Sequence, residues 1–104
     1  MPDYMFIYHG GKKPDTPEEG EKVMGQWNDW YASMGAALKH GGGPAGMSKT
    51  VSKGGVANDG GANPVSGFTL VAAKDQDAAC EIAKGCPMVM DGSGSVEVAQ
   101  LIEM

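Results

Sequence analysis

His9 is the side chain in this sequence best suited to proton transfer, because imidazole changes its charge close to neutral pH. It ends the aromatic and β-favouring segment 4–9 and precedes Gly10 and Gly11, where a backbone without side chains lets a ligand approach. These features favour a general base or a polar contact at the mouth of a pocket. A strand-end histidine that is partly solvated or bonded to a neighbour explains the same residues, and both interpretations stay open.

Two tryptophans are suited to form the apolar wall of such a pocket. Trp27 and Trp30 are three residues apart and share a helical stripe with Val23 and Met34. Large aromatic side chains line pockets for flat apolar ligands, and we expect Tyr8, Trp27 and Trp30 to contact a ligand of this kind. A stripe at helical spacing is also typical of a buried core, which is the competing interpretation.

Other kinds of chemistry have less support. Cys80, Cys86, His9 and His40 do not have the spacing of metal ligands, and we predict no metal site. Cys86 follows a predicted helix end, where a thiolate is disfavoured, and His40 is expected in a last helical turn, where a cation is favourable. The glycine run 41–43 follows a helix instead of opening one, so it does not form a phosphate loop. We therefore expect no cofactor.

The composition indicates one small acidic domain. The 104 residues suffice for a single domain spanning residues 1–104 with one core. All eight basic residues are lysines and 13 residues are acidic, and the resulting net charge of −5 argues against nucleic-acid binding. No apolar run is long enough to span a bilayer and no signal peptide is recognisable. We therefore expect no membrane association and a cytoplasmic protein with free thiols.

The predicted first strand, 4–9, has two apolar faces. Its alternation places His9 on the same face as Met5 and Ile7, while Tyr4 and Phe6 point to the other side. A strand of this kind should be covered on both sides.

A long helix and an edge strand are expected next. Thr16 caps the helix, with proline in the first helical position and Glu19 completing a capping box. The apolar spacing predicts about 22 helical residues at 1.5 Å each, ending near Lys39 and His40. Segment 46–53 predicts a weakly apolar strand at the sheet edge, and segment 54–66 a long turn-rich loop.

The second half of the chain completes a βαββαβ order. Segment 67–73 predicts a buried strand, and Asp75 or Asp77 caps a short helix that ends at Gly85. Segment 95–104 predicts the last strand. This order is typical of an α+β, ferredoxin-like fold with a four-stranded antiparallel sheet and two helices on one face. The other face would expose an apolar patch, so we expect a homodimer through the sheet faces.

Several segments together resemble the YCII-related proteins of the dimeric α/β-barrel superfamily. They are 4–10 (YMFIYHG), 23–30 (VMGQWNDW), 67–71 (GFTLV), 83–87 (AKGCP) and 94–98 (GSVEV). The resemblance implies a ferredoxin-like homodimer, a dimeric α/β barrel, with a cavity between sheet and helices or between sheets. Many relatives carry an Asp-Gly-Pro-Phe motif before the third strand, where this chain has Asn58-Asp59-Gly60-Gly61. By that position Asp59 is expected to orient His9.

The resemblance also sets limits on the predicted activity. Other branches have a histidine on the first helix, where this chain has Gln26 and Trp27. The activity we expect is binding of a small, partly apolar molecule, with cofactor-free proton transfer or elimination by His9 and Asp59. The alternative is a non-enzymatic dimeric protein-interaction module, which would be favoured if His9 and Asp59 do not converge on one site.

Overall fold

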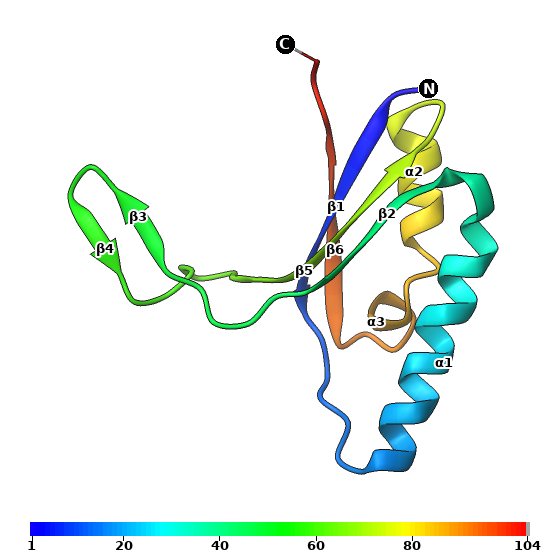
Figure 1. Ribbon diagram of the computed structural model, residues 1–104, viewed down its shortest axis with the longest axis horizontal. Helices are drawn as coiled ribbons and strands as arrows, with labels where there is room; N and C mark the ends of the chain where they lie inside the picture. Colours follow the sequence, from blue (N-terminus) through cyan, green and yellow to red (C-terminus); the bar gives the residue numbers. More distant parts are fainter. Residues whose placement is uncertain (104) are drawn as a thin grey trace.

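The computed structural model describes residues 1–103 and contains a four-stranded antiparallel sheet with helices on one side (Figure 1). The strands lie in the order β2-β5-β1-β6. Their bounds are β1 Asp3–Gly10, β2 Leu38–Pro44, β5 Val65–Ala72 and β6 Gly94–Gln100. The helices are α1 Pro17–Met34, α2 Gln76–Ala83 and the single turn α3 Pro87–Met90. The predicted α+β class and four-stranded antiparallel sheet are confirmed.

Strand β1 lies in the middle of the sheet and has the two predicted faces. Tyr4, Phe6 and Tyr8 are buried against the helices, while Met5 and Ile7 on the opposite face are half-buried. The alternation follows from the period of two in a strand. One face of the strand therefore belongs to the core, and the other lies on the side away from the helices.

Helix α1 begins as its sequence predicts. The Thr16 hydroxyl accepts a hydrogen bond from the Glu19 amide, and Pro17 occupies the first turn. The Glu19 carboxylate accepts from the amide of Asp15, one residue before the cap. These contacts satisfy amide groups that have no partner within the helix.

The predicted end of this helix near His40 is wrong. Helix α1 ends at Met34, and Gly35, with φ 55°, ends it before the short 3-10 turn Gly35–Ala37. The chain then enters β2, so His40 lies in a strand. Glycine is common where a helix stops because it adopts positive φ without strain. The two alanines and the leucine that follow Gly35 continue the apolar helical pattern, but helix α1 ends before them.

The edge strand β2 is built from the glycine run, and not from segment 46–53 as predicted. Gly42 has φ 66°, and a β-carbon there would collide with the carbonyl oxygen of Phe68. The close approach of β2 to β5 therefore depends on glycine at this position. Pairing with β5 outweighs the low strand propensity of glycine.

Segment 46–53 instead enters a separate hairpin. Strands β3 (Thr50–Ser52) and β4 (Gly55–Ala57) pair only with each other in the described sheets. The hairpin projects away from the sheet on the side opposite the helices (Figure 1). We call residues 46–57 the arm. It replaces part of the loop predicted for residues 54–66.

The remaining elements largely follow the predictions. Asp75 caps α2 by accepting from the Ala78 amide. Helix α3, with Pro87 in its first turn and Cys86 at its N-cap, was not predicted. Strand β6 ends at Gln100, earlier than predicted, and Met104 lies outside the described residues.

The core is an aromatic layer between α1 and the sheet. The rings of Phe6 and Trp30 stack with centroids 6.1 Å apart, and the indole of Trp30 donates a hydrogen bond to the Ile82 carbonyl. This contact ties α1 to α2 across the face of the sheet. No helix within residues 1–103 is long and apolar enough to cross a membrane.

Candidate functional site

His9 forms a polar pair with a glutamate that the sequence analysis did not identify. Its Nε2 lies 2.9 Å from a carboxylate oxygen of Glu97, and its Nδ1 lies 3.2 Å from the Pro64 carbonyl oxygen. A carbonyl oxygen and an ionised carboxylate both only accept, so each ring nitrogen must carry a hydrogen to make both bonds. The arrangement fits the imidazolium form of His9 paired with the Glu97 carboxylate.

The surroundings of His9 favour this charge. The hydrogen bond to Glu97 is the main cause that raises the pKa of His9, and the bond to Pro64 adds to it. Partial burial of the ring opposes the shift. The side chain of Glu97 is 60% exposed, so its carboxylate reaches solvent or a ligand. The pair thus combines a His9 ring fixed by two hydrogen bonds with a Glu97 carboxylate that is open to solvent.

The strand register places this pair on the side of the sheet away from the helices. Ile7 pairs with Glu97 on one side and with Phe68 on the other, so these three side chains share a face. We call this surface the sheet face. Its members are Met5, Ile7, His9, Phe68, Leu70 and Glu97.

A second histidine lies on the same surface. The ring of His40 stacks on Phe68 with centroids 6.2 Å apart, and its Nδ1 accepts a hydrogen bond from the Gly42 amide. Phe68 is 40% exposed, which is high for a phenylalanine in a strand. The sheet face therefore combines an apolar, aromatic floor with two imidazoles and one carboxylate.

Asp59 does not orient His9 in this structure. Its carboxylate accepts from the Gly61 amide, and its carbonyl accepts from the Thr50 hydroxyl, both beside the arm. Both ring nitrogens of His9 are already bonded to Pro64 and Glu97. Asp59 thus forms an ordinary Asx turn with the backbone of its own loop. Glu97 occupies the place beside His9 that was expected for Asp59.

The aromatic residues predicted to bind a ligand lie on the other side of the sheet. Tyr8 packs edge to face on Trp27, with ring centroids 5.1 Å apart, and Trp27 packs on Trp30. The Tyr8 hydroxyl donates to the Thr69 hydroxyl at 2.6 Å, which in turn donates to the Gly41 carbonyl. Burial raises the pKa of Tyr8. Tyr8 and Trp30 are core residues, and Trp27 is half-buried at the edge of the core.

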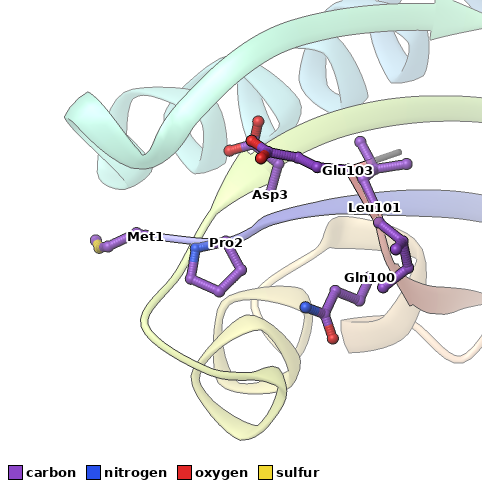
Figure 2. Close-up of a pocket in the computed structure, with 7 residues that line it drawn as sticks. Met1, Pro2, Asp3, Gln100, Leu101 and Glu103 are labelled. Atoms are coloured by element: carbon purple, nitrogen blue, oxygen red, sulfur yellow. The ribbon is translucent and has the colours of Figure 1, made fainter.

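Neither of two hollows that residues 1–103 form is lined by His9. A groove of about 590 Å³ lies between α1 and α3, with Gln26, Asp29, Trp30, Met90 and Asp91 among its lining residues. A pocket of about 320 Å³ lies where the two ends of the chain meet (Figure 2). A site at His9 would therefore need a second surface to enclose it.

Other reactive groups do not gather into a site. Cys86 is fully buried, and burial raises the pKa of its thiol, so the neutral form is favoured. Within residues 1–103, no three His, Cys, Asp or Glu side chains lie close enough together to hold a metal ion.

Comparison with known proteins supports the fold. No family model and no curated protein matches the sequence. Among solved structures, the chain is similar to 5-chloro-2-hydroxyhydroquinone dehydrochlorinase (TftG) from Burkholderia phenoliruptrix AC1100, in a complex with 2,5-dihydroxybenzoquinone. The TM-score is 0.57 at 13% identity, and the match covers 96% of this chain and 95% of that one. The protein shares its fold with this dehydrochlorinase, and the ferredoxin-like architecture is supported at that level.

Proposed function

We propose that the protein is a YCII-related homodimer that binds a small, partly apolar acidic molecule at the sheet face. On such a molecule it catalyses cofactor-free proton transfer or elimination through His9 and Glu97. The observation that carries this proposal is the close pairing of His9 with Glu97 beside the exposed, apolar side chain of Phe68. Fold likeness to a dehydrochlorinase found with a hydroxyquinone adds support for the ligand class.

The geometry divides the chemistry between the two residues. In an elimination, a proton of the ligand passes to Glu97, the electron pair left behind forms a double bond, and a leaving group departs with its bonding pair. The His9 cation stabilises the negative charge that develops on the ligand oxygen. Because both nitrogens of His9 donate to acceptors, Glu97 takes the role of base that the sequence analysis assigned to His9.

A second copy of the chain would enclose this site. Met5, Ile7 and Leu70 are only half-buried and Phe68 is 40% exposed, on a face that no described helix covers. Sheets that pack face to face lie about 10 Å apart, which suits a flat ligand held between facing side chains. These exposed apolar side chains support the proposed homodimer, in which His9 and Glu97 would lie at the interface.

Calorimetric titration with 2,5-dihydroxybenzoquinone, an acidic enol, tests the proposal. Both N–H groups of His9 are already bonded, so the ligand is attracted by the positive charge of the ring. His9→Gln removes that charge and should weaken binding of the anionic ligand about tenfold or more. Tyr8→Phe is the matched control, since Tyr8 points to the other side of the sheet. Equal affinity of the wild type and His9→Gln, or no binding to folded wild type at millimolar ligand, would count against the proposal.

The second candidate is a non-enzymatic dimeric interaction module. It is favoured by the separation of the predicted site residues, because His9, Asp59 and the tryptophans do not converge. A module predicts that His9→Gln and Glu97→Gln leave small-molecule binding unchanged while substitutions of Ile7 and Phe68 abolish self-association. The titration above distinguishes the two.

A further inference from the structure

We infer that the arm of one copy docks into the pocket formed by the chain ends of a second copy. The inference rests on the proposed homodimer and adds to it a partner surface and a specific orientation of the two copies. It is carried by the exposure of the arm, its position on the molecule and its match to the pocket.

The arm is a short hairpin without internal support. Val51 and Val56 pair across its two strands and are 76% and 60% exposed, and Met47 at its base is fully exposed. Every strand residue of the arm is exposed. A lone two-stranded hairpin is marginally stable at best in water. The exposed valines of the arm are therefore available to pack against another surface.

The pocket at the chain ends has complementary chemistry. Its apolar members include Met1, Pro2, Leu101 and Ile102, of which Ile102 is 70% exposed. Asp3 and Glu103 add two carboxylates, and Figure 2 shows both of them turned toward the same rim.

The arm, in turn, is basic. Lys49 and Lys53 are its charged residues, and it has no acidic residue between Gly46 and Ala57. In a chain with a net charge of −5, a segment that is basic and apolar is matched to a hollow that is acidic and apolar. The pocket of about 320 Å³ has room for a valine pair and the stem of one lysine.

The arm and the pocket lie at opposite ends of the sheet. The arm leaves from the end where β2 stops and β5 begins, whereas both chain ends lie at the other end (Figure 1). A two-fold axis that crosses the strands between two facing sheets brings opposite ends together. The arm also projects on the side of the sheet face (Figure 1). Each arm would then reach the partner's pocket, and the contact would occur twice.

Disulfide trapping tests this contact. The test uses a Cys80→Ser background, in which Val51→Cys is combined with Ile102→Cys and the protein is mildly oxidised. We expect about tenfold more covalent dimer than a control pair gives under the same conditions. Met24→Cys with Ile102→Cys is the control, because Met24 is exposed on α1 at the opposite side of the sheet. Each single variant controls for like-with-like pairing.

Charge exchange gives an independent test. Lys49→Glu with Lys53→Glu should raise the dimer dissociation constant about tenfold or more, and Asp3→Lys with Glu103→Lys in the same chain should restore it. A wild-type dimer whose stability none of these changes affects, with no trapped Val51–Ile102 disulfide, would overturn the inference and leave the sheet-face dimer standing. A wild-type monomer would overturn both.

Discussion

The charge on His9 is the property of a single residue that most affects the proposed chemistry. Glu97 raises the pKa of His9, so the folded state binds the proton more tightly than the unfolded chain does. The stabilisation from this pair is therefore fully present below the ordinary histidine pKa of about 6.5. It is lost as the pH rises through the raised pKa of the folded state.

We predict a pH-dependent difference between the wild type and Glu97→Gln. At pH 5.5 the wild type should be more stable to urea by about 0.5–1 kcal/mol, a small value because Glu97 is largely exposed to solvent. Well above the raised pKa the difference should shrink toward zero. NMR titration of the His9 ring should show a lower pKa in Glu97→Gln. A difference in stability that grows with pH would contradict the pairing.

Tyr8→Phe tests whether Tyr8 is a core residue. The change removes the hydroxyl that donates to Thr69 and should cost about 1 kcal/mol of unfolding free energy. Thr69 keeps its bond to the Gly41 carbonyl, so the loss should not be larger. Urea denaturation measures the cost. If Tyr8→Phe were as stable as the wild type but bound ligand more weakly, Tyr8 would be a ligand-binding residue and not a core residue.

The sequence could indicate the face of His9 but not its partner. The period of two in β1 correctly placed His9 with Met5 and Ile7. Glu97 lies 88 residues later in the chain, and only the register of β1 with β6 brings it to His9. The alternation of Val96 and Val98 with Glu97 was the available signal, since it points the glutamate outward.

At the scale of elements, strand β2 shows what local patterns cannot supply. Three consecutive glycines have low strand propensity, and the strand exists because β5 supplies hydrogen-bond partners for its backbone. The capped beginnings of α1 and α2 were predictable because capping depends on a few adjacent residues. The end of α1 depended on Gly35, within an apolar pattern that continued past it.

Gly42→Ala tests the path of β2. A β-carbon at Gly42 would collide with the backbone of Phe68, and the positive φ of Gly42 is strained for any residue with a side chain. Nothing lies within 4 Å of a β-carbon at Gly43. We expect Gly42→Ala to lower Tm by about 10 °C or more, at about 4–8 °C for each kcal/mol in a domain of this size. Gly43→Ala should change Tm by a few degrees at most. Equal effects of the two substitutions in thermal unfolding would contradict the described strand.

At the scale of the whole molecule, the described helices cover one side of the sheet and leave the other side uncovered. The core side is filled by aromatic residues, and the sheet face has half-buried apolar residues around one ion pair. The βαββαβ order could be predicted because each of these elements has its own local sequence pattern. That order in turn predicted helices on one side of the sheet. The arm could not be predicted because its strands are three residues long and rich in turn-forming neighbours.

Substitutions on the sheet face should separate the dimer without unfolding the chain. Ile7→Asp with Phe68→Asp places two charges on the proposed interface, while the aromatic layer on the other side stays intact. We expect a monomer with a near-native far-ultraviolet circular dichroism spectrum. Lys12→Glu with Lys13→Glu, exposed changes before α1, should leave the dimer unchanged.

Native mass spectrometry of gently purified protein tests the central claim, that the sheet face is the functional surface and is enclosed by a second copy. The account predicts a species of twice the chain mass of 10.7 kDa that takes up 2,5-dihydroxybenzoquinone. In Ile7→Asp with Phe68→Asp, both the doubled mass and the added ligand should disappear together. A species of 10.7 kDa at every concentration, or ligand uptake that survives in the monomeric variant, would contradict it.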